Sequence, residues 1–250
     1  AEKALELRTS DNVVSGGSIE IITGSSIDAS GSVLIGSGDS ATGNAGDVII
    51  AVGAGATQQG GNVAVTAGSV QYDGIGASTG GDVLLGAGEG DNGGSVSVSG
   101  GRGANGAGGD ITLQSGPGSV GHSGGAVNIV GGEDGGAVSL TGGSASSTRS
   151  IGGAVAVTGG ASHVQGGDVV VSAGAGIDGA AGTVKMEGGL STTEASGRVE
   201  VSTRSGKSSG EIVVSTGAAS DGHAGGISLQ AGSAAGDRAA AGSVHLNAGS

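Results

Sequence analysis

A short pattern of apolar and polar residues recurs along the whole chain. In the stretch GGAVAVTGG, Gly152 to Gly160, two valines two residues apart stand between glycines. Apolar residues at this spacing lie on one face of an extended strand, so the pattern predicts a β-strand followed by a loop. Seventeen repeats carry it, with spacings of 11 to 20 residues, and they begin at Lys3, Gly17, Gly31, Gly46, Gly61, Gly81, Gly94, Gly109, Gly125, Gly136, Gly153, Gly167, Gly182, Gly197, Gly210, Gly225 and Gly242.

The first eight positions of each repeat, here called its apolar segment, have distinct residue types. Positions 3 and 5 hold Val, Ile, Leu or Met, and position 2 holds a short polar or small residue in all repeats except those with Arg198 and Glu211. Position 7 is mostly Ala, Gly or Thr, and position 8 is Gly in all repeats except those with Ser10 and Arg204. The variation in length follows position 8, as expected for loops on one side of a repeat array.

The repeats predict an all-β fold, a β-solenoid with one strand per repeat. About 15 residues would form each coil, and 17 coils would stack with parallel, in-register strands, because every repeat runs in the same direction. Positions 3 and 5, such as Val155 and Val157, would then point inward. A stack of antiparallel hairpins is the alternative. We interpret residues 1–250 as one continuous repeat array, a segment of a longer protein or filament, because neither end shows a polar cap.

Composition narrows the class of protein. Gly accounts for 62 of 250 residues, with one Pro, one Tyr and no Phe, Trp or Cys, so an aromatic core is excluded. Gly does not fall at every third position, which excludes collagen. Charged residues are only 12%, and aliphatic residues recur at fixed positions, which argues against disorder. The net charge of −13 argues against nucleic-acid binding, and the short apolar runs predict no membrane span.

Three stretches suggest a resemblance to known repeat proteins. SGDSATGNAGDVIIAVGAG, GASTGGDVLLGAGEGDNGGSVSVSGG and GHSGGAVNIVGG resemble Gly-rich repeats of large extracellular proteins of diatoms, oomycetes and related algae. They also resemble repeats of long fibre proteins of marine phages. The resemblance implies a filament, surface or adhesive role and a location outside the cell or on the surface of a cell or virion. It assigns no functional residues.

Candidate sites for chemistry are few. Asp47 and Asp82 stand at position 2, and stacked coils would bring them, with Asn62, about one strand spacing apart as weak candidate ligands for Ca²⁺. A solvated acidic edge is the alternative. The four His residues lack metal-ligand spacing, and no helix follows any Gly-x-Gly-x-x-Gly string. The sequence therefore indicates no catalytic residue, no cofactor and no enzyme.

Position 4 carries the most informative irregularity. It is apolar in four consecutive repeats, at Leu34, Ile49, Ala64 and Leu84, which we call the apolar stripe. A contiguous apolar stripe on an outer face usually marks a contact surface. Long loops of the same chain, such as the one with Val70 and Tyr72, are the alternative cover.

These features together predict a structural role. We expect a non-enzymatic protein of an extracellular filament, appendage or adhesive surface layer, whose partners are other copies of itself or other filament or matrix proteins. The alternatives are an ice- or glycan-binding module and a phage-type fibre or adhesin segment. Ice binding typically needs outward threonines, and Thr112 is the only threonine at position 4.

Overall fold

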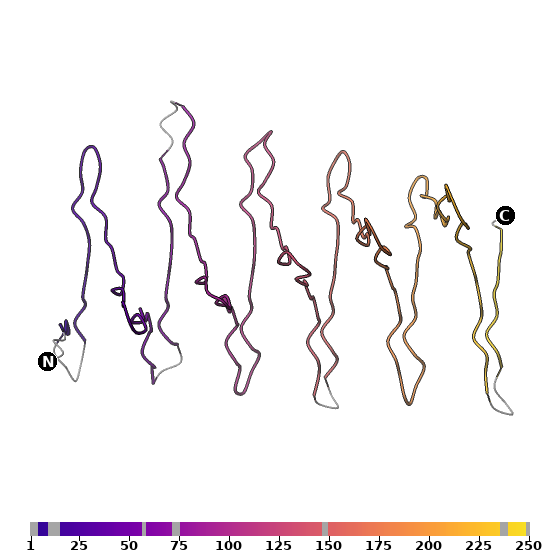
Figure 1. Cartoon of the computed structure of the whole chain (residues 1–250), viewed down its shortest axis with the longest axis horizontal. Coiled ribbons are helices and arrows are strands. Elements are labelled where there is room, and N and C mark those ends of the chain that lie inside the picture. The colour runs from indigo at the N-terminus through magenta and orange to yellow at the C-terminus, as the bar shows by residue number, and fades with distance from the viewer. Residues whose placement is uncertain are drawn as a thin grey trace. The chain divides into compact units, whose positions relative to one another are not determined.

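The computed structural model describes residues 5–9, 16–56, 59–71, 76–146, 150–235 and 240–248. Over these residues the chain is extended and irregular, with neither a helix nor a β-strand (Figure 1). Short turns lie at residues 120–121 and 133–135. The chain divides into two contact units, Ala1–Val127 and Asn128–Ser250, and both consist of the same repeat.

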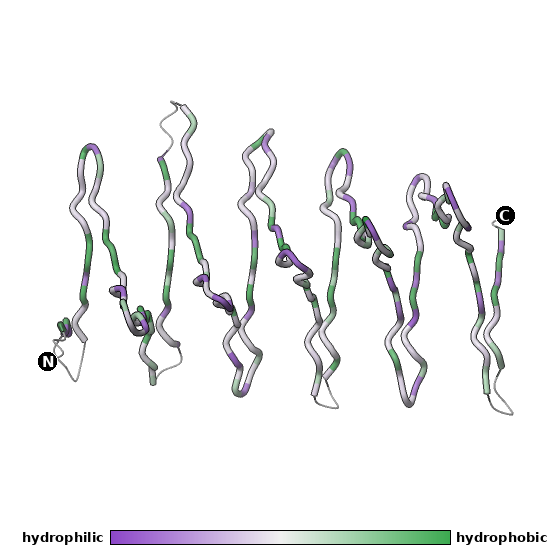
Figure 2. Tube along the Cα trace, in the orientation of Figure 1, coloured by the Kyte–Doolittle hydropathy of each residue, from purple (hydrophilic) through white to green (hydrophobic). Residues whose placement is uncertain are grey.

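The predicted all-β solenoid is wrong. No ladder of strands, parallel or antiparallel, joins the repeats in the described ranges, and no described residue is buried. Val155 and Val157, expected in a core, are 54% and 69% exposed. The chain exposes 24833 Å² of surface, whereas a compact protein of its mass exposes about 9,500 Å². Figure 2 shows the apolar residues distributed along the extended segments instead of gathered in one place.

Ten of the repeats are instead joined to the next by a loop whose base is closed by one hydrogen bond. In ten junctions the N–H of the glycine at position 1 donates a hydrogen bond to the carbonyl oxygen of the glycine at position 8 of the preceding repeat. The distance is 2.8 Å from Gly167 N to Gly160 O and 3.0 Å from Gly182 N to Gly174 O. One bond per junction fixes the loop base but does not continue as a ladder, and this is why no strand forms. The remaining donor–acceptor pairs are Gly81–Gly68, Gly94–Gly88, Gly109–Gly101, Gly125–Gly116, Gly136–Gly132, Gly153–Gly143, Gly197–Gly189 and Gly242–Gly232.

The shortest loop shows how tight the junction can become. Gly136 donates to the Gly132 carbonyl oxygen at 3.0 Å, so only Glu133, Asp134 and Gly135 lie between them. Asp134 has a φ of 58° and Gly135 a φ of 97°. Two consecutive residues with positive φ reverse the chain sharply, and glycine adopts such a φ without steric cost.

The residue type at position 7 differs between most junctions that have this hydrogen bond and most that lack it. The ten bonded junctions follow Ala or Gly at position 7, and in one case Ser115. The junctions after Gly24, Gly38, Gly53, Arg204 and Gly217, all between described residues, lack the bond. Position 7 there holds, in order, Thr23, Ser37, Val52, Thr203 and Thr216. Threonine or valine at position 7 therefore accompanies loss of the closing bond, whereas serine occurs in both groups, at Ser115 and Ser37.

The geometry at these junctions gives the reason. The Val52 Cγ1 atom lies 2.7 Å from the place where a Cβ on Gly61 would stand, so the side chain occupies the space next to position 1. Thr23 supplies a substitute contact, because its Oγ1 donates to the Gly31 carbonyl oxygen at 3.2 Å. Where position 7 is glycine, as at Gly159, a Cβ would collide with the Gly167 carbonyl oxygen. Small residues at position 7 allow the two backbones to approach.

Candidate interaction surface

The aliphatic residues of positions 3 and 5 form two exposed columns. From Ile19 to Val244, position 3 is 46 to 58% exposed, and position 5 is 60 to 89% exposed over all seventeen repeats. The least exposed column is position 7, since seven of the nine described residues that are partly covered stand there. These seven are Thr9, Ala67, Ser115, Gly131, Gly142, Gly159 and Ala231. The chain thus covers its small residues and leaves its aliphatic residues in contact with water.

Charged pairs within the segments show the alternation of an extended chain. Lys185 Nζ lies 2.7 Å from Glu187 Oε1, and Arg198 Nη2 lies 2.7 Å from Glu200 Oε2. Both pairs are two residues apart, which is the spacing that places side chains on one side of an extended backbone. The side chains of both pairs are exposed, and such ion pairs contribute little to stability. The period of two predicted from the sequence is present locally without a sheet.

The apolar stripe is exposed throughout. Leu34 is 95% exposed, Ile49 80% and Leu84 89%, and Ala64 is exposed as well. The loop that follows the segment with Ala64 begins after Gly68. Its described part includes Val70, which is also exposed, while Tyr72 lies outside the described residues. Each of the four side chains is therefore available for a contact, but without stacked coils they do not share one sheet face, and their role as an interaction surface stays a prediction.

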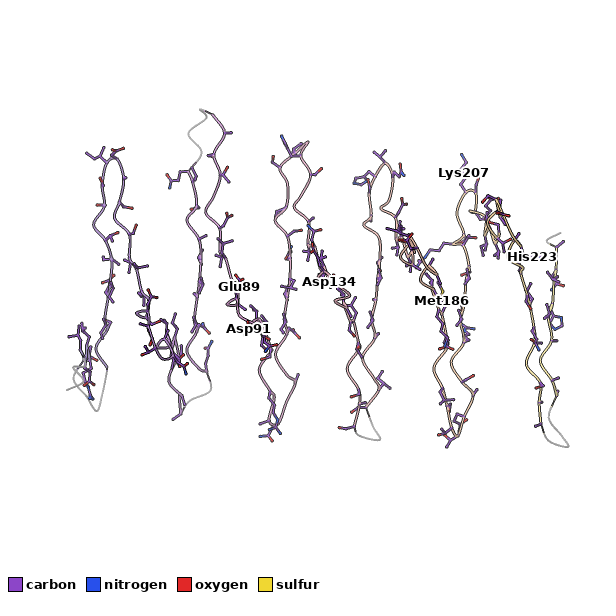
Figure 3. The ribbon with its side chains drawn as sticks, viewed as in Figure 1. Glu89, Asp91, Asp134, Met186, Lys207 and His223 are labelled. Carbon is purple, nitrogen blue, oxygen red and sulfur yellow. The ribbon has the colours of Figure 1, made fainter. Side chains whose placement is uncertain are left out.

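The candidate calcium ligands stand apart from any ligand cluster. Asp47 and Asp82 are exposed, and the described ranges contain no group of three or more His, Cys, Asp or Glu side chains arranged to hold a metal ion. In Figure 3 the labelled charged residues Glu89, Asp91, Asp134 and Lys207 project from loops, whereas Met186 projects from position 5 of an apolar segment. Calcium binding stays a prediction.

One shallow hollow lies beside a loop. It has a volume of about 210 Å³ and is lined by Ala161, Ser162 and His163, three consecutive residues. Two of the lining side chains are polar, those of Ser162 and His163, and Ser162 Oγ accepts a hydrogen bond from the backbone N–H of Val164 at 3.2 Å. Over the described residues, no helix is long and apolar enough to cross a membrane.

The loop junction is the feature that sequence reasoning missed. The glycine columns at positions 1 and 8 are visible in the sequence, but their spacing alone does not indicate a hydrogen bond between them. The signal that could have identified the junction is the adjacent pair of glycines at positions 7 and 8, as in Gly142–Gly143 and Gly159–Gly160. In these pairs a Cβ on the first glycine would collide with the next repeat, while nothing lies near the second.

Comparisons with known proteins do not change this picture. No protein-family model, no characterised protein and no solved structure matches the chain.

Proposed function

We propose that this chain is a non-enzymatic structural protein of an extracellular filament, appendage or adhesive surface layer. The observation that carries the proposal is the exposure of the aliphatic side chains of positions 3 and 5 in all seventeen repeats. Exposed apolar surface favours association, because association removes that surface from water. A chain built almost entirely from such repeats suits assembly better than catalysis.

Five apolar segments are aliphatic on both sides of the chain. In each of them positions 3, 4 and 5 are all Val, Leu or Ile, and all of these side chains are at least half exposed. Strands with continuous aliphatic runs are normally covered on both faces. These segments therefore suit contacts on two sides, as in a filament or layer, and they are Val33–Ile35, Val48–Ile50, Val83–Leu85, Val169–Val171 and Ile212–Val214.

The loops supply solubility before assembly. Acidic residues such as Glu89, Asp91 and Asp134 lie in loops, and the chain has a net charge of −13. A net charge far from zero opposes random aggregation of soluble chains. Association is then directed to the exposed aliphatic side chains of the apolar segments.

The test is self-association of the purified chain against a variant with a charged stripe. Lys at Ile49 and Leu84 leaves Val48, Ile50, Val83 and Leu85 unchanged, but it places two charges in the apolar stripe. We expect the wild-type chain to sediment as assemblies and I49K/L84K to assemble less at the same concentration. The matched control adds the same charge in neighbouring loops, as T42K/N92K, and should assemble like the wild type. A wild-type chain that stays monomeric at high concentration would contradict the proposal.

A further inference from the structure

Two neighbouring apolar segments combine every feature needed for pairing with another chain. Gly136–Gly143 and Gly153–Gly160 are joined by the hydrogen bond from Gly153 N to Gly143 O, 2.8 Å long. Between their end positions, the backbone N–H and C=O groups of Ala137–Gly142 and Ala154–Gly159 form no hydrogen bond. Unpaired backbone groups of an extended, apolar segment are a ready template for strand pairing.

The side chains of these two segments suit the same contact. Neither segment contains a charged residue, and the aliphatic side chains Val138, Leu140, Val155 and Val157 are between 50% and 70% exposed. Between their glycines, Ala137–Thr141 and Ala154–Thr158 contain no charge, proline or glycine, and short segments of this kind favour stacking between identical chains. Parallel, in-register stacking of identical chains places like charges side by side, which is unfavourable. Because these two segments carry no charged residue, they avoid this repulsion.

We infer that the partner on these segments is a second copy of this chain, aligned in parallel and in register. The irregular spacing of the repeats supports this choice. The loop before Gly136 has three residues and the loop before Gly153 has nine, while the spacings of the whole array vary from 11 to 20 residues. Only a chain with the same series of spacings brings an apolar segment opposite every apolar segment, and a second copy has that series.

The exposed area is sufficient for such an interface. A standard protein interface buries about 800 Å² on each partner. At roughly 50 Å² for each half-exposed aliphatic side chain, about sixteen side chains reach that area. Eight of the seventeen repeats would provide them. The inference rests on the proposed assembly function and specifies its partner and register.

The chain lacks cysteine, which permits a direct test of register. Parallel in-register strands lie about 4.8 Å apart, and Cα atoms about 4.4 to 6.8 Å apart can form a disulfide. Ser139→Cys and Ala156→Cys each introduce one thiol at position 4 of the two segments. Each variant is assembled alone and oxidised mildly. The two are then mixed before assembly, with one chain carrying a size tag, so that S139C–A156C products can be separated from products between identical positions.

We expect disulfides between identical positions in both variants, with a yield several-fold above that of the S139C–A156C product. Oxidation in denaturant, where the chains are separate, is the control and should remove this preference. Assembly with equal or greater yield of the S139C–A156C product would overturn the in-register arrangement while leaving the proposed function in place. A chain that does not assemble would overturn both.

Discussion

The residue at position 7 influences whether the backbone forms the hydrogen bond that closes the loop base. Ala173 stands at this position, and its Cβ lies 3.4 Å from the place of a Cβ on Gly182, which is ordinary van der Waals contact. The hydrogen bond from Gly182 N to Gly174 O forms beside it. Thr216 stands at the same position before a junction that lacks the bond. Threonine at position 7 thus accompanies an open loop base and alanine a closed one, whereas serine occurs with both, at Ser37 and Ser115.

Ala173→Thr should open the junction between Gly174 and Gly182. The added Cγ2 and Oγ1 atoms need the space through which the two glycine backbones approach. A net hydrogen bond contributes about 1 kcal/mol, so hydrogen exchange of the Gly182 amide should rise about fivefold. Ser172→Thr is the matched control, because threonine at position 6 accompanies closed junctions at Thr141 and Thr158. Equal exchange rates in the two variants would exclude the steric explanation.

At the scale of the element, the junction is independent of the loop that it closes. The same Gly–Gly hydrogen bond closes three residues between Gly132 and Gly136 and twelve between Gly68 and Gly81. Loop-closure entropy changes slowly with length, by roughly 0.6 kcal/mol for each doubling. The loop can therefore vary while the apolar segments and their junctions stay the same.

Replacing the loop Ala161–Gly166 by Glu-Asp-Gly, the sequence of residues 133–135, should leave the bond from Gly167 N to Gly160 O intact. The expected outcome is an unchanged, slow exchange of the Gly167 amide in nuclear magnetic resonance. A second chimera with Glu-Asp-Ala is the control. It should exchange faster, because the last loop residue needs the positive φ seen at Gly135. Loss of the bond in both chimeras would show that the junction depends on its own loop.

The sequence predicts the local structure of the repeat better than it predicts the fold. The repeat, the alternation seen in the Lys185–Glu187 pair and the place of the loops follow from spacing alone. The sequence did not correctly predict the burial of Val155 and Val157. A period of two shows which side chains share a face, but not whether the same chain or another chain covers that face. The apolar stripe follows from residue type, whereas the junction depends on a backbone approach that residue type shows only indirectly.

At the scale of the whole molecule, charge and apolar surface act in opposite directions. The net charge of −13 makes copies of the chain repel one another, whereas the exposed aliphatic columns favour contact. Added salt screens the repulsion, since the Debye length falls from about 30 Å at 0.01 M to about 8 Å at 0.15 M, but it does not weaken apolar burial. The balance therefore depends on ionic strength.

Self-association should increase with salt. Sedimentation velocity of the wild-type chain across this salt range is expected to show a rising fraction of assemblies. The variant I49K/L84K should assemble less than the wild type at each salt concentration, because its defect lies in the apolar stripe and screening does not restore the lost apolar contact. Association that weakens with salt would instead mean that ion pairs between loops hold the chains together. The nine Lys and Arg residues would then be the contacts to mutate, and the aliphatic columns would need a different explanation.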